Sequence, residues 1–267
     1  MRIALLQGEA LPLDVDANLR AVAEAAGAAR EHGAELLLTP ELWVSGYAPR
    51  ELAEWLTPER VASIPSDIAE MAADQGIAIA ASFPFARSDG SYAIAAGLWD
   101  RRGAEVLRYE KVHLWGADEP LAFSPSAARP EVAEWNGRTV GFQICYDIEF
   151  PEPTRGLAER GADLILVPTA IDGFSDYVPA VTVRSRAAEN ALVVAYADHA
   201  AKRDRGDDPG ETFAGLSTVA GREGIVLALA GREAELLLAD IPDVAPVPAG
   251  QADYLSDRRP DLYSSWG

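Results

Sequence analysis

Apolar runs of strand length alternate with helical patterns at the start of the chain. The run "MRIALLQ" predicts a strand, and "DANLRAVAEAAGAAREHGA" predicts an amphipathic helix with Asp16 at its N-cap and Gly33 at its end. The run "ELLLTPE" predicts a second strand. This alternation is typical of layered α/β proteins rather than of helical bundles.

Further strand-length runs continue to residue 240, many of them without helices between them. They are "GIAIAASFP", "YAIAAGLWD", "EVLRYEKVHL", "RTVGFQIC", "ADLILVPTA", "ALVVAYAD", "FAGLSTVA", "GIVLALA" and "AELLLAD". About twelve strands of this kind predict two mixed β-sheets packed together, with helices outside. No low-complexity linker divides the chain, so residues 1–267 are expected to form a single domain.

Two segments stand apart from this pattern. "AKRDRGDDPGE" (201–211) is rich in charge and glycine, which predicts an exposed loop near a site. The tail 245–267 is rich in proline and then aromatic, so we expect it to pack, with a subunit interface of a homodimer or larger homo-oligomer as the suggested place.

Composition narrows the function classes. The chain is 49% apolar and has a formal charge of −19, which disfavours nucleic acid and anionic membranes as partners. It has no secretory signal pattern and no run of about 20 apolar residues, so a cytoplasmic location is expected. One cysteine and three histidines make a poor metal set, and no cofactor is expected. The acidity fits a solvated surface, with adaptation to salt as an alternative.

Cys145, the only cysteine, follows the apolar run "TVGFQI" and precedes Pro151, which is suited to the first turn of a helix. It is therefore expected at the carboxyl end of a strand, where ligands bind in α/β sheets. A nearby helix N-terminus favours a thiolate. Position alone leaves a nucleophile and a buried small hydrophobe equally open.

A nucleophilic thiol needs a base, because its ordinary pKa of about 8.5 leaves little thiolate near neutrality. His113 is one candidate, whereas His32 and His199 lie in less promising segments. Glu41, which closes the run "AELLLTPE", is the other candidate. Lys111 also stands out, because it and Lys202 are the only lysines among 23 basic residues, and a compact ammonium can approach an oxyanion or thiolate at one point.

These residues and their flanks carry a family resemblance. "TPELWVSGY", "YEKVHLWGADE" and "GFQICYDIEFPE", in that order, resemble the nitrilase superfamily of carbon-nitrogen hydrolases. "IALLQ", "VPTAIDG", "RSRAAEN" and "YLSDRRPDLY" extend the resemblance over nearly the whole chain. The chain departs from the family pattern after "HLWGADEPLAF", where Ser126 stands in the place of a glycine, so the turn there is not predicted.

The resemblance implies an αββα sandwich and a Glu-Lys-Cys triad, here Glu41, Lys111 and Cys145. Glu119 in "GADEPLAF" matches a second glutamate beside the triad. The backbone N–H of Tyr146 is expected to hold the oxyanion. The substrate and oxyanion site is further expected to include Tyr47, Thr169 and Ala170.

The expected reaction is hydrolysis of a small amide, short aliphatic or chiral, to acid and ammonia. The segment "PTAIDG", placed after the sixth or seventh strand, is similar to that of small amidases. The rival enzymes are an N-carbamoyl amine hydrolase, for which Asp172 and Asp176 would hold a cationic substrate, and a nitrilase. A non-catalytic α/β binding protein is the alternative from another class.

Overall fold

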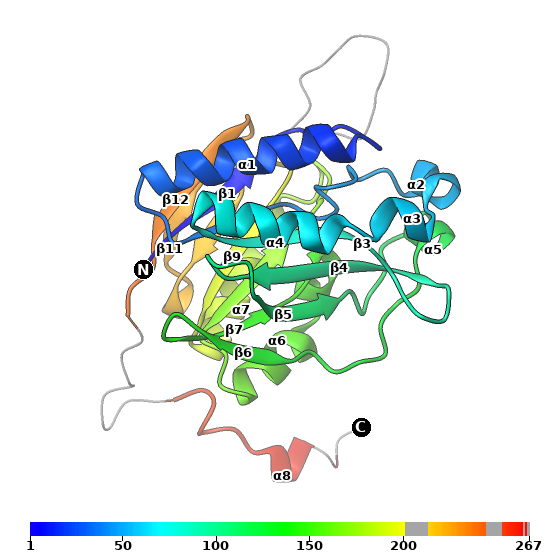
Figure 1. Cartoon of the computed structure of the whole chain (residues 1–267). Helices are drawn as coiled ribbons and strands as arrows, with labels where there is room; N and C mark the ends of the chain where they lie inside the picture. The colour runs from blue at the N-terminus through cyan, green and yellow to red at the C-terminus, as the bar shows by residue number, and fades with distance from the viewer. Residues whose placement is uncertain (201–212, 244–252, 264, 266–267) are drawn as a thin grey trace.

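Two β-sheets packed face to face form the centre of the molecule in a computed structural model of the chain (Figure 1). The structure describes residues 1–200, 213–243, 253–263 and 265. The segment 201–211, predicted to be an exposed loop, lies outside these residues. The described strands number twelve, six in each sheet, which confirms the predicted two-sheet α/β fold.

The two sheets repeat one pattern of strand directions. In each sheet, three adjacent strands run parallel to one another. One strand pairs antiparallel on one side of these three, and two further strands join by antiparallel pairing on the other side. The first sheet has the order β12 (Glu235–Asp240), β1 (Arg2–Gln7), β2 (Leu36–Leu38), β3 (Ala78–Ala86), β4 (Tyr92–Trp99), β5 (Glu105–Glu110). The second has the order β11 (Val226–Leu229), β10 (Thr218–Ala220), β9 (Val193–Ala197), β8 (Leu164–Pro168), β7 (Arg138–Phe142), β6 (Val132–Trp135).

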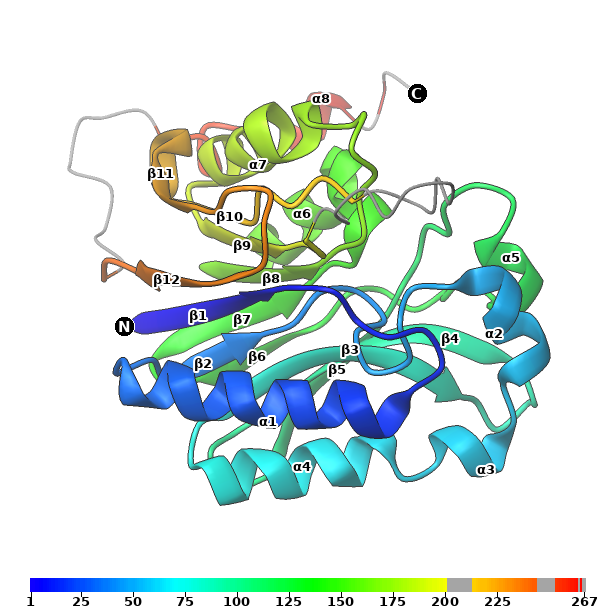
Figure 2. The same cartoon turned by 90° about the horizontal axis from the view of Figure 1, so that it is seen from above.

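Helices cover the outer face of each sheet, which makes four layers (Figure 2). The long helices α1 (Val15–Glu31) and α4 (Ile64–Gln75) lie on the first sheet, and α6 (Pro151–Glu159) and α7 (Val183–Asn190) lie on the second. The shorter helical segments are α2 (Pro49–Trp55), α3 (Pro58–Val61), α5 (Glu119–Ala122), η1 (Cys145–Glu149), η2 (Val178–Thr182), η3 (Arg222–Gly224) and α8 (Pro260–Tyr263). None of the described helices is long and apolar enough to cross a membrane.

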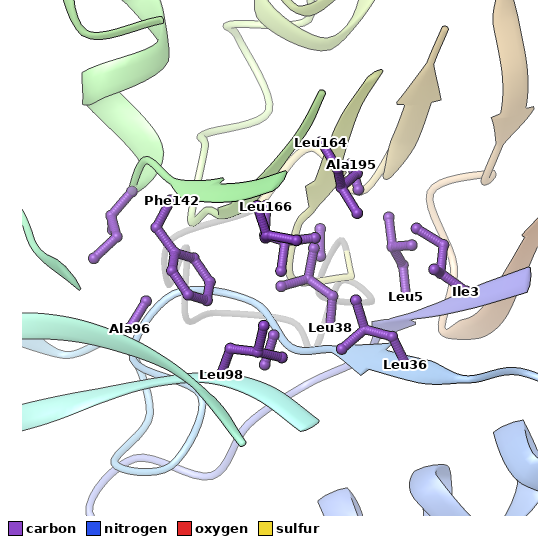
Figure 3. Packing of buried hydrophobic residues seen from close by; sticks show 14 of the residues in the cluster. Ile3, Leu5, Leu36, Leu38, Ala96, Leu98, Phe142, Leu164, Leu166 and Ala195 are labelled. Carbon is purple, nitrogen blue, oxygen red and sulfur yellow. The ribbon is translucent and has the colours of Figure 1, made fainter. Parts of the chain in front are cut away.

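Alternate residues of the central strands face the two sides of their sheet, as the period of two in a strand requires. In β2, Leu36 and Leu38 point into the core between the sheets, and Leu37 packs under the helices. In β8, Leu164 and Leu166 face the same inter-sheet core (Figure 3). Burial on both faces explains why these strands have continuous apolar sequences.

Local details correct some of the sequence expectations. The N-cap of α1 is Asp14, not Asp16, because the Asp14 side chain accepts the N–H of Ala17. Gly33, with φ 76°, follows the helix end as expected. Pro151 begins α6, which confirms that prediction. The expected placement of "PTAIDG" after the sixth or seventh strand is wrong: its proline ends β8, because the short strand β6 was missed.

The described part of the tail lies along the outer helices of the second sheet in both views (Figures 1 and 2). Arg258 forms an ion pair with Glu159 of α6, and Leu255 packs at the edge of the cluster under α6 and α7. Tyr254 is 64% exposed. These residues of the tail therefore contact their own chain, and contact with a second subunit stays a prediction.

Candidate active site

The predicted triad residues lie just past the carboxyl ends of three strands. Glu41 follows β2, Lys111 follows β5 directly, and Cys145 follows β7 as the first residue of η1. All three are buried, with exposed fractions of 0% for Glu41, 1% for Lys111 and 4% for Cys145. Glu41 also joins the sheets, because its backbone N–H donates to the carbonyl of Thr169 after β8 at 3.1 Å.

The Lys111 ammonium lies between two buried carboxylates. Its Nζ donates to Glu41 Oε1 and to Glu119 Oε1, each at 2.7 Å. Glu119 is fixed in turn by the hydroxyl of Tyr47, which donates to Oε1 at 2.9 Å, and by the N–H of Trp115, which donates to Oε2 at 2.8 Å. The structure thus brings Glu41, Lys111 and Glu119 together in one network.

The Lys111 backbone is held as well. Its N–H donates to the carbonyl of Ile94 and its carbonyl accepts the N–H of Ser126, at 2.9 and 2.8 Å. Ser126 therefore takes part in this turn through its backbone, and its φ is not in the left-handed region. A serine can replace the family's glycine here because no such conformation is required.

Cys145 has φ 46°, a left-handed conformation that is costly for a residue with a Cβ. The turn is held by Asp147, whose side chain accepts the N–H of Ile144 at 3.1 Å, the N–H of His113 at 2.9 Å and the hydroxyl of Tyr109 at 2.8 Å. These bonds fix the direction in which the turn presents the thiol.

Burial sets the protonation chemistry of the site. It raises the pKa of Glu41 to about 7, against the opposing charge of Lys111 and with a further rise from Glu119. Burial also raises the pKa of the Cys145 thiol, as does the charge of Glu41, whereas Lys111 lowers it. For Lys111, burial lowers the pKa, but Glu41 and Glu119 outweigh this and the net pKa is raised. The resting pair is therefore a thiol beside a carboxyl that titrates near neutrality, with a charged ammonium next to both.

The remaining predicted site residues lie on the segments that follow β7 and β8. Tyr146 is the second residue of η1, so its N–H is among those of the first turn, which lack intrahelical acceptors. The Thr169 side chain lowers the pKa of the Cys145 thiol and donates to the Tyr196 hydroxyl at 3.1 Å. Ala170 is half-buried directly after Thr169.

The alternative base, His113, is engaged elsewhere. Its Nδ1 lies 2.8 Å from Asp147 Oδ1, and its ring stacks on Phe150 with centroids 4.1 Å apart. His113 therefore supports the turn that carries the thiol. By contrast, Glu41 Oε2 is buried and has no hydrogen-bond partner among the described residues, so it is available to accept a proton.

Two residues beside the site were not selected from the sequence. His199, placed in an unpromising segment, is 1% exposed and its Nε2 lies 2.7 Å from the Glu41 carbonyl oxygen. Asp198 is fully buried and accepts the N–H of Ile171 at 3.1 Å. Both follow β9, so the same strand-end argument that selected Glu41 and Cys145 could have found them.

The acidic residues proposed for a cationic substrate are already partnered. Asp172 accepts the N–H of Phe174 at 2.8 Å and the hydroxyl of Ser175 at 3.1 Å. Asp176 forms an ion pair with Arg232. In the described part of the chain, no three His, Cys, Asp or Glu side chains are grouped so that they could hold a metal ion.

Buried glutamate, lysine and cysteine at converging strand ends agree with a match of residues 2–248 to the family described as "Carbon-nitrogen hydrolase". The chain belongs to the carbon-nitrogen hydrolase family. It is a hydrolase of carbon-nitrogen bonds other than peptide bonds, with the nitrilase-superfamily fold expected from the sequence.

Solved structures and curated relatives agree with this assignment. An amidase from Nesterenkonia sp. AN1 is 42% identical over 100% of this chain and 99% of its own, with a TM-score of 0.91. In an E41Q variant of that amidase, acrylamide has added to the active-site cysteine. A "Hydrolase in pqqF 5'region" from Pseudomonas protegens is 38% identical over 98% of this chain and 90% of its own. An (R)-stereoselective amidase from Pseudomonas sp. is 31% identical over 91% and 84%.

Proposed function

We propose that the protein is an amidase that hydrolyses small, short aliphatic amides to a carboxylic acid and ammonia through a thioester on Cys145. The observation that carries the proposal is the Lys111 ammonium, held at 2.7 Å from both Glu41 and Glu119 beside the strained Cys145 turn. The amidase from Nesterenkonia sp. AN1 supports it, because a C145A variant of that protein is described in complex with butyramide.

In the first step, Glu41 takes the Cys145 proton and the sulfur forms a bond to the amide carbonyl carbon. The carbonyl π electrons move to oxygen, and Lys111 Nζ and the Tyr146 N–H stabilise the oxyanion. A charged lysine is suited to this role, since its pKa is raised by the neighbouring carboxylates.

In the second step, the oxyanion collapses and the carbon-nitrogen bond breaks. Glu41 gives its proton to the departing nitrogen, which leaves as ammonia, and the acyl group remains on sulfur. Glu41 then deprotonates a water molecule, whose oxygen attacks the thioester. The carbon-sulfur bond breaks, and the proton held by Glu41 returns to the thiolate. A carboxyl with a pKa of about 7 can act as acid and base in turn near neutral pH.

Glu119 is assigned to orienting groups rather than to removing a proton. Its Oε1 already accepts Lys111 Nζ and the Tyr47 hydroxyl, and its Oε2 accepts a backbone N–H. This carboxylate holds Lys111 against the oxyanion position and faces the amide nitrogen of the substrate. We place Thr169 and Ala170 along the substrate because they follow β8 next to the thiol.

An ammonia-release screen over short amides, nitriles and N-carbamoyl amines tests the substrate class. We expect turnover of short aliphatic amides and no release above background from Cys145→Ala. Preference for an N-carbamoyl amine or a nitrile would replace the amide, and full activity in Cys145→Ala would end the proposal. An inert Cys145 in iodoacetamide labelling, together with no turnover of any compound, would favour a binding protein without catalysis.

We also propose a homodimer or larger homo-oligomer, in which the aromatic tail contributes to the interface. The exposed Tyr254 (64%), Leu262 (40%) and Tyr263 (38%) of the tail support this. Gel filtration at micromolar concentration is expected to give at least the dimer mass, and a monomer would contradict it. A cytoplasmic location stays a prediction.

A further inference from the structure

Glu41 is held at both of its peptide groups by segments of the opposite sheet. Its side chain comes from the end of β2 in the first sheet. Its N–H donates to the Thr169 carbonyl after β8, and its carbonyl oxygen lies 2.7 Å from Nε2 of His199 after β9. Because a carbonyl oxygen only accepts hydrogen bonds, Nε2 carries the proton and donates it. The next residue, Leu42, has φ 48°, so the backbone beside Glu41 is also strained.

The His199 ring is clamped between two aromatic side chains. It stacks on Trp43 with centroids 5.6 Å apart and an angle of 15°, and on Phe213 with centroids 4.7 Å apart and an angle of 28°. At the backbone, the N–H of His199 donates to Asp198 Oδ1 at 2.9 Å. Ring plane and backbone are therefore both fixed, and Nε2 can point only toward a narrow range of positions.

One of the two stacked aromatic side chains, Phe213, also leads to Glu119. Phe213 meets Tyr47 edge to face, with centroids 6.0 Å apart and an angle of 84°, and the Tyr47 hydroxyl donates to Glu119. His199 thus contacts the Glu41 carbonyl directly, and it is linked to Glu119 through Phe213 and Tyr47. The contact of His199 Nε2 with Glu41 is to the backbone carbonyl and not to the carboxylate, so we do not assign His199 as the base.

We propose that His199 is a positioning residue that holds Glu41 in line with Lys111 and Cys145 by donating its Nε2 proton to the Glu41 carbonyl. The proposal rests on the proposed amidase function for its kinetic readout. Displacement of a catalytic group by about 1 Å can cost about a hundredfold in rate, so a single backbone bond at this place can affect turnover strongly.

Two variants separate the contribution of the Nε2–H donor of His199 from that of its ring stacking. His199→Phe keeps an aromatic ring between Trp43 and Phe213 but leaves the Glu41 carbonyl without its donor. His199→Gln loses the ring but offers an amide N–H at similar reach. We expect His199→Phe to lower kcat by between about tenfold and a hundredfold with KM changed less than about threefold. His199→Gln should recover much of that loss.

The rate of Cys145 alkylation by iodoacetamide, measured against pH, gives a readout that does not need turnover. The groups around Glu41 that influence its titration are Lys111, Glu119, Cys145, Tyr47 and Asp198. None of them is changed in the variants. If Glu41 moves away from Lys111, the ammonium stabilises its carboxylate less, so the midpoint of the alkylation profile should rise in His199→Phe.

His32→Gln is the matched control. Its Nδ1 also lies 2.8 Å from a backbone carbonyl, that of Ala28, but His32 is exposed at the end of α1. The control should keep the wild-type kcat and alkylation midpoint. A folded His199→Phe with wild-type kcat and midpoint, or His199→Gln no better than His199→Phe, would overturn the proposal.

If His199→Phe does not fold, His199→Gln decides alone. A kcat of His199→Gln within about threefold of wild type supports the proposed donor role of His199, and a loss of about tenfold or more refutes that role. Failure of the amidase proposal would instead appear as no ammonia from the wild type with any compound, while the alkylation profiles would still test His199.

Discussion

Two ion pairs at different places on the first sheet show how burial changes the same chemistry. Past the end of β5, Lys111 bonds Glu41 at 2.7 Å with both side chains 0% exposed. On β1 and β12, Arg2 bonds Asp240 at 2.9 Å with side-chain exposures of 42% and 73%. The Arg2 hydrogen bond lowers the pKa of Asp240, whereas burial raises the pKa of Glu41 to about 7 although its cation is closer.

The contrast shows that a cation partner alone does not decide the protonation state of a carboxyl group. Where water is excluded, loss of hydration outweighs the attraction, and the second carboxylate of Glu119 adds to the rise. Where water remains, the hydrogen bond and charge of Arg2 outweigh the small effect of burial on the pKa of Asp240, and such an exposed pair adds little stability. The carboxyl of the buried pair therefore titrates near neutrality, and the exposed pair is a surface contact.

The largest expected effect comes from changing the shape of the buried cation. Lys111→Arg keeps the positive charge, but the broad guanidinium cannot occupy the point between Glu41 and Glu119. We expect kcat/KM for a short amide to fall by about a thousandfold. Arg108→Lys, on the more exposed part of β5 beside Glu105, is the control and should stay near wild type. Wild-type rates in Lys111→Arg would remove Lys111 from the oxyanion site.

The next largest effect is expected for Glu119→Gln. A neutral amide cannot accept Lys111, Tyr47 and the Trp115 N–H together, because one of its two polar atoms is now a donor. Turnover should fall by about a hundredfold, while iodoacetamide still alkylates Cys145. Loss of thiol reactivity would instead show that Glu119 helps to activate the nucleophile.

The pH profile tests the raised pKa of Glu41. In the proposed mechanism Glu41 must be ionised to accept the thiol proton, so activity should be present above its pKa and lost as pH falls through about 7. Below that point, kcat/KM should drop by about tenfold per pH unit. The acidic limb should move or disappear in Glu41→Gln if residual activity can be measured. A limb near pH 4, the ordinary range for a glutamate, would contradict the role given to burial.

The smallest effect is expected at the exposed pair. Asp240→Asn removes its charge but leaves water free to solvate Arg2. Activity should stay within about twofold of wild type, and the thermal unfolding midpoint should change little. A loss of activity comparable to that of Glu119→Gln would show that the two pairs are not as different as their burial indicates.

The two-sheet fold followed from patterns that are local in sequence, whereas the triad was implied by the resemblance of three motifs to a known family. Apolar runs predicted the strands, and strand ends made Glu41 and Cys145 candidates. The strand β6, which has no fully buried residue, gave too weak an apolar run to be recognised. His199 lies just past the end of β9 and so met the same strand-end criterion, but its role also depends on Trp43 and Phe213, which the fold brings to it from distant positions. The left-handed φ of Cys145 was also invisible, since no glycine marked it.

The central claim is that Cys145 carries the acyl group of the substrate during turnover. The most direct test is to quench the enzyme with acid while it hydrolyses a slow amide, digest it and measure peptide masses. The account predicts one acyl group on the peptide that contains Cys145, removable by hydroxylamine and absent in Cys145→Ala. An acyl group on another side chain, or wild-type ammonia release from Cys145→Ala, would contradict it.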